Sequence, residues 1–216
     1  MSGRLVVFEG VEGAGKTTQL ERLALRLGRH GVTLHMLREP GGTAVGDEIR
    51  ALLLRPGTLI PPRSEALLFM ASRAALMDQQ VLPALERDEM VLMDRFFLST
   101  YAYQVAGRGL PEREVREANT FATGGRIPDV TVLLTLPVSE GLARAARRGQ
   151  ADRMEQADRA FHDRVEDAFA RFADERWQVM HPECGPLVPV SAVGSVDEVE
   201  DRIRRVIAAA CPEVQG

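Results

Sequence analysis

The amino-acid sequence predicts an α/β fold in which a five-stranded parallel sheet is flanked by helices. Two observations predict it: short, continuously apolar runs recur along the chain, and helical patterns separate them. Such runs are typical of strands buried on both faces, and alternation of strand and helix implies parallel pairing with right-handed crossovers. The predicted strands are LVVF (5–8), VTLHML (32–37), MVLM (90–93), VTVLLTL (130–136) and LVPV (187–190).

Helical patterns lie between and after these strands. The segment QLERLALRLGRHG (19–31) is amphipathic and is predicted to end at Gly31. A long helix is predicted to start at Ser64, with Glu65 in its first turn. Two further helical patterns cover residues 155–177 and 196–210. The first of these carries an apolar stripe made of Phe161, Val165, Ala168, Phe169 and Phe172.

The composition is that of an ordinary globular domain. With 216 residues, 45% of them hydrophobic and 27% charged, the chain is expected to form a single domain over residues 1–216. The net charge of −4 argues against a general affinity for nucleic acid or for an anionic membrane. Cys184 and Cys211 match no metal or redox spacing. The first apolar run is too short for a signal peptide or a membrane span, so a cytoplasmic location is expected.

A phosphate-binding loop follows the first predicted strand. Residues 10–17 spell GVEGAGKT, which fits the pattern G-x-x-x-x-G-K-[ST]. The glycines let backbone N–H groups point at phosphate oxygens, and the following helix offers its positive end. A strand before the loop and a helix after it are the context of a P-loop NTPase fold; the alternative is a glycine-rich turn with a surface lysine. The predicted nucleotide-binding residues are Gly10, Val11, Glu12, Gly13, Ala14, Gly15, Lys16, Thr17 and Thr18.

Lys16 is the only lysine in the chain, and the other 26 of its 27 lysine or arginine positions are arginine. A lysine in this loop must place a compact ammonium between the β- and γ-phosphates of a nucleotide. The wide, planar guanidinium of arginine has the wrong shape for that slot. The sequence therefore predicts that Lys16 contacts the phosphates.

An aspartate and an arginine end the third predicted strand. In P-loop proteins an aspartate at the end of a neighbouring strand helps to hold Mg²⁺, and Thr17 offers a hydroxyl to the same ion. Asp94 suits that role because open α/β folds bind ligands at the carboxyl edge of the sheet. Arg95 would then face a second phosphate group. The alternative is an ordinary ion pair at the end of a strand.

Several separated motifs together resemble the thymidylate kinase family over nearly the whole chain. They are FEGVEGAGKTTQ (8–19), REPGGT (38–43), LLFMASRA (67–74), DRFFLSTYAYQ (94–104), PDVT (128–131) and RRGQADRMEQ (147–156). A P-loop alone occurs in many families, but this combination of motifs at these separations is specific. The resemblance implies an enzyme that transfers the γ-phosphoryl of ATP to dTMP, giving dTDP, with Mg²⁺ as a cofactor and dTMP and ATP as its small-molecule partners.

The resemblance also implies a nucleoside pocket. In the family a phenylalanine on the long helix stacks on thymine, and an arginine one turn later hydrogen-bonds the ring; Phe69 and Arg73 match these places. Without the resemblance they would be assigned to core packing and to a solvated helix face. Tyr103 matches the residue that closes the sugar pocket against a ribose 2′-hydroxyl. Thr100 and Gln104 flank it as candidate nucleoside contacts.

Charged residues in three motifs are implied to hold the acceptor. Arg95, together with Arg38 from REPGGT, resembles the family's clamp on the monophosphate, and guanidinium groups suit a dianionic phosphate. Glu12 matches the family carboxylate that approaches the sugar 3′-hydroxyl. The acceptor phosphate is already anionic near neutral pH, so the reaction requires positioning and charge stabilisation without a strong general base.

The family divides by the position of a catalytic arginine. One branch carries it in the P-loop directly after the acidic residue, where this chain has Gly13. The other branch carries arginines in a lid, and the run RAARRGQADR supplies several. The sequence therefore resembles the lid-arginine branch, with a short mobile lid at about 144–156. The arginines of the lid motif are Arg147, Arg148 and Arg153, and the predicted catalytic residues are Lys16, Arg95, Arg148 and Arg153.

Two more features follow from the resemblance. Many relatives have an aspartate where the fourth predicted strand has Thr135, so a secondary polar contact near the lid or the nucleotide is expected to be absent. The family also implies a homodimer built from apolar helix faces, and LLFMASRAALM (67–77) is rich in apolar residues.

Several other functions remain open at this point. A different nucleoside monophosphate kinase would share the loop and the lid, and a deoxynucleoside kinase would need a carboxylate base for a sugar hydroxyl. A guanine-nucleotide switch usually requires a second lysine in an [NT]-K-x-D motif, which a chain with one lysine lacks. A P-loop ATPase that acts on nucleic acid normally has a basic surface. A binding protein that merely resembles a kinase is excluded only by an assay.

Overall fold

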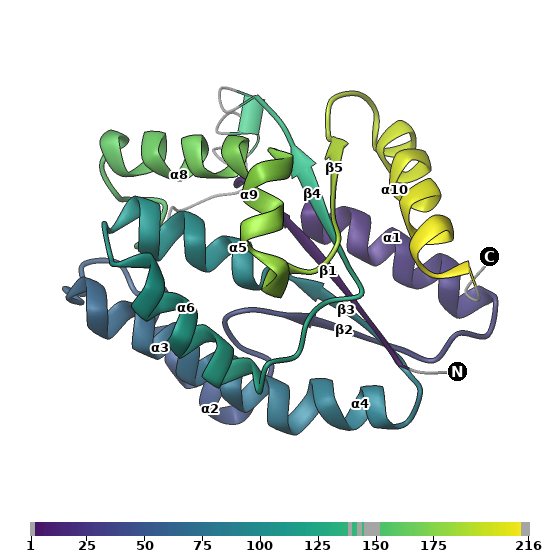
Figure 1. The fold of residues 1–216 in the computed structure, drawn as a ribbon, viewed down its shortest axis with the longest axis horizontal. Coiled ribbons are helices and arrows are strands. Elements are labelled where there is room, and N and C mark those ends of the chain that lie inside the picture. The colour runs from purple at the N-terminus through teal and green to yellow at the C-terminus, as the bar shows by residue number, and fades with distance from the viewer. Residues whose placement is uncertain (1–2, 138–139, 142–143, 145–151, 213–216) are drawn as a thin grey trace.

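The structure is a computed structural model that describes residues 3–137, 140–141, 144 and 152–212, and it confirms the predicted sheet (Figure 1). All neighbouring strands are parallel, in the order β2-β3-β1-β4-β5. The chain reverses its direction of winding around β1, so the loop after β1 lies at a topological switch point. The strands are β1 (Arg4–Gly10), β2 (Leu34–Arg38), β3 (Met90–Asp94), β4 (Val130–Thr135) and β5 (Leu187–Ser191).

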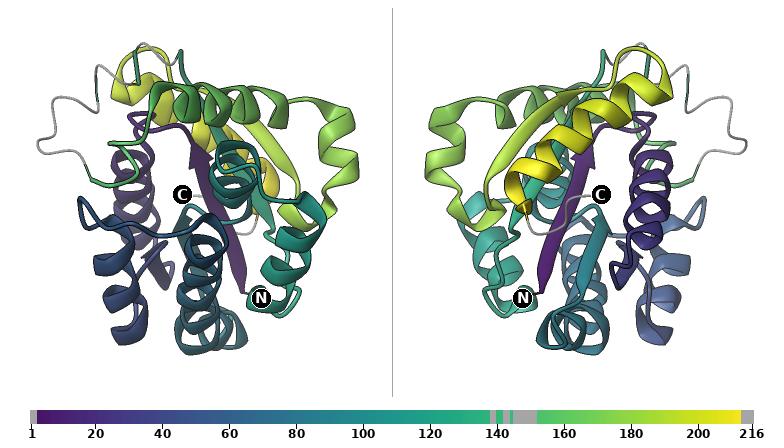
Figure 2. Two further views of the ribbon diagram at one scale, coloured as in Figure 1. Left: turned by 90° about the vertical axis from the view of Figure 1, so that its left-hand side faces the viewer. Right: turned by 90° about the vertical axis from the view of Figure 1, so that its right-hand side faces the viewer.

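Helices cover both faces of the sheet. Figure 1 places α3, α6 and α8 on one side of the molecule and α1 and α10 on the other; the left view of Figure 2 faces the first side and the right view faces the second. The described helices are α1 (Lys16–Arg29), α2 (Ala44–Leu54), α3 (Pro62–Leu76), α4 (Leu82–Glu86), α5 (Phe97–Thr100), α6 (Glu112–Thr123), α8 (Arg159–Phe172), α9 (Glu175–Met180) and α10 (Val196–Ala210). Of the helices in these ranges, none is long and apolar enough to cross a membrane.

Each strand contributes side chains to two separate hydrophobic cores, because successive side chains point to opposite faces of the sheet. On β1, Val6 and Phe8 pack with α1 and α10, while Leu5 and Val7 pack against the other layer of helices. These side chains are buried on both faces, as expected for a central parallel strand. The two cores therefore cover the sheet from both faces.

The long second helix is confirmed, with a start two residues earlier than predicted. It begins at Pro62, where proline is tolerated because the first N–H of a helix has no partner within the helix. Glu65 lies in its first turn, as predicted. A π-helical segment, Met77–Val81, joins α3 to α4, so the same helical path continues to Glu86. A second π-helical segment, Tyr101–Gly107, extends α5.

The helix predicted over residues 155–177 is wrong in its extent. The helix α8 starts only at Arg159, because the Asp158 side chain accepts a hydrogen bond from the Phe161 N–H and caps it there. A second cap at Asp174 begins the separate short helix α9. The apolar stripe itself is confirmed: Phe161, Val165, Ala168, Phe169 and Phe172 are all buried. Helices α2 and α6 were not predicted.

Candidate active site

The carboxyl ends of three neighbouring strands lie together at one edge of the sheet. Arg38 at the end of β2 is in register with Asp94 at the end of β3, and Asp94 is in register with Phe8 of β1. The P-loop leaves β1 two residues later, at Gly10. The motifs REPGGT, GVEGAGKT and DRFFLS, far apart in the sequence, therefore meet at the same place.

The P-loop closes over the side chain of Lys16, the first residue of α1. Gly15 precedes it in the left-handed region, with φ of 88°, which lets the loop turn sharply into the helix. The Lys16 Nζ donates hydrogen bonds to the carbonyl oxygens of Gly10 at 2.9 Å and Val11 at 3.0 Å. Burial and the nearby Arg95 lower the pKa of Lys16 to about 8. The ammonium is thus held in the loop at a cost that a bound anion would offset.

Thr17 and Asp94 lie side by side on the open side of the loop. The Thr17 hydroxyl donates to Asp94 Oδ2 at 2.8 Å, and both side chains line the cavity above the loop. Within the described residues, no group of three or more His, Cys, Asp or Glu side chains could by itself hold a metal ion. A hydroxyl and one carboxylate suit an ion such as Mg²⁺, which keeps several waters and takes further oxygen ligands from a phosphate.

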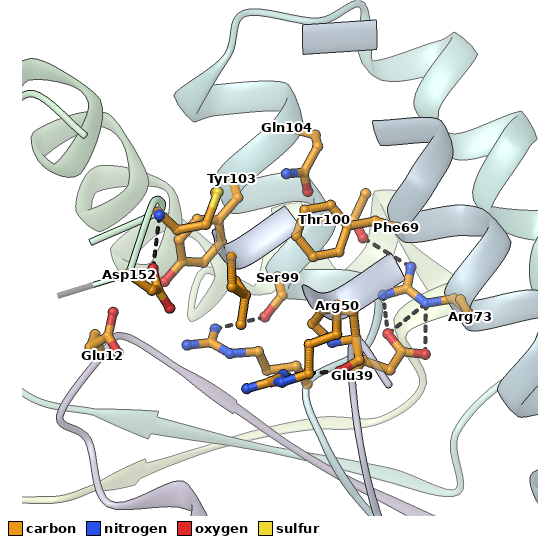
Figure 3. A pocket seen from close by; sticks show the side chains of 14 residues that line it. Glu12, Glu39, Arg50, Phe69, Arg73, Ser99, Thr100, Tyr103, Gln104 and Asp152 are labelled. Atoms are coloured by element: carbon orange, nitrogen blue, oxygen red, sulfur yellow. Dashed lines mark hydrogen bonds and ion pairs between the residues drawn. The ribbon is translucent and has the colours of Figure 1, made fainter. Parts of the chain in front are cut away.

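Two cavities meet at this edge. The larger lies over the P-loop and is lined by Gly13, Ala14, Gly15, Lys16, Thr17, Thr18, Arg38 and Asp94, among others. The smaller lies between α3 and the segment after β3 (Figure 3). Glu12, Glu39, Arg50 and Arg95 line both cavities, so they mark the junction between them.

Arg95 is fixed at the junction by its neighbours. Its backbone adopts φ of 73°, an uncommon left-handed conformation for arginine, and its N–H donates to the Phe8 carbonyl oxygen at 2.9 Å. The guanidinium donates to Ser99 Oγ at 3.0 Å and lies 5.3 Å from the centre of the Tyr103 ring. Burial would lower the pKa of Arg95, but Tyr103 and nearby carboxylates raise it above its ordinary value. Arg95 therefore stays cationic.

A buried carboxylate explains how this conformation is maintained. Glu9, at the end of β1, accepts hydrogen bonds from the N–H groups of Phe96 at 2.6 Å and Ser99 at 3.0 Å. Its second oxygen accepts from the Ser99 hydroxyl at 2.7 Å. The same hydroxyl then accepts from Arg95. Glu9 thus positions the backbone and the side chain that orient Arg95.

Arg50 completes a cluster of cations that sequence reasoning did not find. Its guanidinium donates to the Pro40 carbonyl oxygen at 2.9 Å and lines both cavities. Burial lowers the pKa of Arg50, and Arg38 and Arg95 lower it further. Arg50 lies on α2, a helix that the sequence pattern did not predict, so no signal singled it out.

The smaller cavity has an apolar side and a polar side. Phe69, Tyr103, Leu54 and Met154 supply apolar surface, while Ser99, Thr100 and Gln104 supply polar groups. Figure 3 shows Phe69 beside Thr100, with Tyr103 on the opposite side of the pocket. The structure therefore brings together Phe69, Arg73, Thr100, Tyr103 and Gln104 as the sequence predicted.

Arg73 is held more tightly than a substrate contact requires. It is only 2% exposed and pairs with Glu39 through Nε, at 3.0 and 2.8 Å to the two carboxylate oxygens, and through Nη2. Its other donors reach Thr100 Oγ1 at 2.9 Å, Asn119 Oδ1 and the Phe96 carbonyl oxygen at 2.9 Å. Every N–H of the guanidinium has an acceptor. A bond to a ligand would share or replace one of these.

Glu39 and Asn119 are the buried partners that sequence reasoning missed. Burial raises the pKa of Glu39, and the ion pair with Arg73 offsets only part of that effect. Glu39 directly follows Arg38 in REPGGT, so the motif itself could have indicated it. Asn119 lies on α6, and its side-chain amide nitrogen has no hydrogen-bond partner in the described part of the chain.

The lid arginines fall partly outside the described residues. Arg147 and Arg148 lie in the range 145–151, which the structure does not describe. Arg153 is described, but it lines neither cavity. Its guanidinium pairs with Glu65 at 2.7 Å and donates to the Leu53 carbonyl oxygen at 2.6 Å.

Two other residues of the predicted lid, Arg144 and Glu155, lie near the P-loop. Burial and a hydrogen bond with Glu12 raise the pKa of Glu155 to about 7. Arg144 lines the cavity above the loop and pairs with Glu140 at 2.6 Å. Thr135, where an aspartate was noted as absent, ends β4 with its hydroxyl donating to the Val190 carbonyl oxygen at 3.4 Å.

Comparisons of the sequence with known proteins point to one family. The sequence model of the family described as "Thymidylate kinase" matches residues 8–184. The thymidylate kinase of Deinococcus radiodurans is 47% identical over 201 residues, which cover 93% of this chain and 94% of the relative. That of Thermomicrobium roseum is also 47% identical, over 205 residues that cover 93% and 97% of the two chains. That of Carboxydothermus hydrogenoformans is 43% identical over 181 residues, covering 83% and 89%.

Proposed function

Because this chain belongs to the thymidylate kinase family and phosphorylates dTMP to dTDP, we propose that its two cavities hold the two substrates of that reaction. ATP, the phosphoryl donor of the family, occupies the cavity over the P-loop. The nucleoside of dTMP occupies the smaller cavity, with its 5′-phosphate at the junction. The acceptor oxygen then faces the terminal phosphate of ATP in line for attack.

One observation carries this proposal: four cations converge on the cavity over the P-loop and its junction with the smaller cavity, beside carboxylates such as Glu12 and Asp94. Lys16, Arg38, Arg50 and Arg95 line the larger cavity, and the pKa values of Lys16 and Arg50 are lowered by burial and by neighbouring arginines. Such a cluster is costly in the free protein and favourable around phosphate groups. A site that binds only one phosphate would not need cations on both sides.

The smaller cavity suits a pyrimidine deoxynucleoside. Phe69 offers its ring face to the base, and Thr100 and Gln104 offer hydrogen-bonding groups to the base edge. Tyr103 closes the pocket on the sugar side, where it disfavours a 2′-hydroxyl. Glu12 lines the same junction and approaches the 3′-hydroxyl. Arg73 contacts the base only if one of its present hydrogen bonds is shared.

Thr17 and Asp94 would hold Mg²⁺ together with phosphate oxygens and water, and their adjacent oxygens fit that ion. When bound, the ion neutralises charge on the terminal phosphates. The chain's own residues do the rest. Lys16 and the loop amides hold the donor, Arg95 and Arg38 hold the acceptor phosphate, and no strong general base is needed because the acceptor oxygen is anionic.

We further propose that the chain belongs to the lid-arginine branch of the family. The conformation of Gly13 supports this: with φ of 74°, a side chain there would be strained, and its Cβ would lie 2.1 Å from the Gly141 carbonyl oxygen. An arginine at this place, as in the other branch, would not fit this arrangement. Arg148 and Arg153 in the lid at about 144–156 therefore supply the charge that the transferred group requires.

We expect Arg153→Ala to lower kcat about 100-fold and to raise the KM for dTMP much less, since a cation that acts in the transition state affects the chemical step. To act in the transition state, the Arg153 side chain must break its ion pair with Glu65 when the lid closes. Arg108→Ala is the matched control, because Arg108 also pairs with Glu65 but lies outside the lid. Steady-state kinetics decide: if both variants lose activity equally, Arg153 acts only by anchoring Glu65.

The pKa of Lys16 predicts how ATP affinity depends on pH. The free protein holds Lys16 at a pKa of about 8, and the anionic phosphates of ATP favour the protonated form. Binding above pH 8 must therefore take up a proton, and affinity should fall by up to about tenfold per pH unit. Calorimetric titrations between pH 7 and 9.5 would test this. The affinity for dTMP should stay flat over the same range, because Arg95 does not titrate there; an equally flat ATP curve would contradict the assignment.

The chain is further proposed to form a homodimer through α3 and α6. These helices pack together, and they expose Leu67 (62%) and Phe121 (89%). We expect light scattering to give about twice 23.8 kDa for the protein and the monomer mass for Phe121→Asp, because a buried carboxylate would oppose association. Leu25→Asp, on the exposed face of α1, should leave the dimer intact. A monomeric parent protein at micromolar concentration would contradict the proposal.

We also propose that residues 1–216 form a single kinase domain and that the protein is cytoplasmic. Limited proteolysis would test the first statement and cell fractionation the second.

The substrate assignment is tested by a coupled assay for ADP release with Mg·ATP and a panel of acceptors. We expect strong turnover with dTMP, weaker turnover with dUMP, and almost none with dCMP, dGMP, AMP or water. If dCMP or a purine nucleotide matched dTMP, the roles of Phe69, Thr100, Tyr103 and Gln104 would be wrong.

A further inference from the structure

Glu65 is a fully buried carboxylate to which the proposed reaction assigns no contact with either substrate. It lies in the first turn of α3, beside the base pocket but outside it, with no part of its side chain exposed to solvent. Its Oε1 accepts from Gln104 Nε2 at 3.1 Å and from Arg108 Nε at 3.1 Å. Its Oε2 accepts from Arg108 Nη2 at 3.0 Å and from Arg153 Nη2 at 2.7 Å.

The two arginines keep Glu65 ionised. Burial by itself would raise the pKa of Glu65, but hydrogen bonds from Arg108, Arg153 and Gln104 outweigh it and hold the pKa below its ordinary value. An ionised carboxylate accepts hydrogen bonds and donates none. Every group that faces Glu65 must therefore present a donor.

This condition fixes the orientation of the Gln104 amide. An amide side chain has two orientations of nearly equal shape, which exchange its oxygen and its nitrogen. With Nε2 bound to Glu65, the Oε1 of Gln104 must point elsewhere. Gln104 lines the base pocket, and in the described part of the chain no hydrogen-bond donor reaches this oxygen. The pocket thus contains an acceptor with a set direction.

Beside this acceptor, the base pocket also contains a hydrogen-bond donor, the hydroxyl of Thr100. Thr100 lies one helical turn before Gln104, and Figure 3 shows both residues at the pocket. Arg73 Nη1 donates to Thr100 Oγ1, so the hydroxyl proton of Thr100 is free to be donated to a ligand. A donor beside an acceptor matches the edge of thymine or uracil, which offers a carbonyl oxygen beside an imino N–H. Cytosine offers an amino group beside an unprotonated ring nitrogen, which is the reverse pattern.

We propose that Glu65 is a specificity-determining positioning residue, which holds Gln104 so that its oxygen accepts the imino N–H of the base and cytosine is rejected. This inference rests on the placement of the base proposed above. Glu65 touches no substrate; it acts through Gln104. Without an acceptor at residue 65, the amide could turn over at little cost and present its NH₂ group to the ring nitrogen of cytosine.

The first test is Glu65→Gln. The oxygen of the new amide should take the place of Oε2, where Arg108 Nη2 and Arg153 Nη2 both need an acceptor, so its NH₂ group faces Gln104. Gln104 then turns over to accept from it. We expect the ratio of kcat/KM for dTMP to kcat/KM for dCMP to fall at least tenfold. A residue that only stabilises the fold would lower both values in proportion and leave this ratio unchanged.

A double-mutant cycle separates the possible failures. Gln104→Leu should also lower the ratio, and adding Glu65→Gln to it should cause no further change, because both act through one contact. If Gln104→Leu lowers the ratio and Glu65→Gln does not, the role of Glu65 is overturned while the base placement stands. If neither variant changes the ratio, the base does not bind against Gln104 and both proposals fail.

A measurement on the unaltered protein covers the case in which Glu65→Gln does not fold. The side-chain NH₂ signals of Gln104, assigned by their loss in Gln104→Leu, can be followed by NMR without dTMP. We expect two sharp signals with slow hydrogen exchange for at least one proton, since Glu65 already holds the amide. Averaged, fast-exchanging signals that sharpen only with dTMP would overturn the inference.

Discussion

Replacing Lys16 with arginine is expected to lower kcat/KM about 1000-fold while the melting temperature stays close to that of the parent protein. The ammonium donates to the carbonyl oxygens of Gly10 and Val11 inside the closed loop and still faces the cavity where the phosphates bind. A planar guanidinium is too wide for this slot, and it would displace either the loop carbonyls or the phosphates. Coupled kinetics and thermal denaturation would measure both effects.

Arg26→Lys is the matched control for this prediction. It makes the reverse exchange on the same helix, α1, at a side chain that pairs with Glu200 near the surface. We expect its kinetic constants to equal those of the parent. Near-normal turnover by a folded Lys16→Arg protein would contradict the role given to the only lysine in the chain.

Arg95→Ala is expected to lower kcat/KM for dTMP about 1000-fold, with less than about a threefold change in the KM for ATP. Arg95 is one of the two arginines that line both cavities, and Ser99, Glu9 and Tyr103 hold it in place. Removing it leaves the acceptor phosphate without its main guanidinium partner at the junction. The loop that binds ATP keeps its own contacts.

The control is Arg87→Ala, which removes an exposed arginine just before the opposite end of the same strand, β3. Its kinetic constants should match those of the parent. A variant of Arg95 that bound dTMP normally but ATP poorly would place Arg95 on the donor side instead, and the assignment of the two cavities would have to be exchanged.

The sheet could be predicted from sequence because its signals are local. Each strand is a continuous apolar run, and burial on both faces selects such runs wherever they occur. The extent of the helix predicted over 155–177 was wrong because capping by Asp158 and Asp174 overrides a stripe of apolar residues. Helix α2 was missed because its packing partner α3, not a strong amphipathic pattern, stabilises it.

The candidate site was predictable where a motif carries the chemistry and not where a partner comes from a distant segment. Lys16 and Thr17 were singled out by the spacing of the P-loop motif, and Asp94 and Arg95 by their place at the end of a buried strand. Nothing in the sequence pairs Arg73 with Glu39 and Asn119, which are 34 and 46 positions away. The same is true of Glu65, whose partners come from two other segments that only the fold brings to it.

The single lysine of the chain makes the P-loop a natural target for selective chemical labelling. With a pKa of about 8, roughly half of the Lys16 side chains carry a free, nucleophilic amine at pH 8, whereas an ordinary lysine is almost fully protonated. A small amine-reactive reagent would therefore find one side-chain amine in the whole sequence, at the wall of the cavity above the loop. The extent to which a nucleotide slows the labelling of that amine would report how much of the loop is occupied, without any engineered probe.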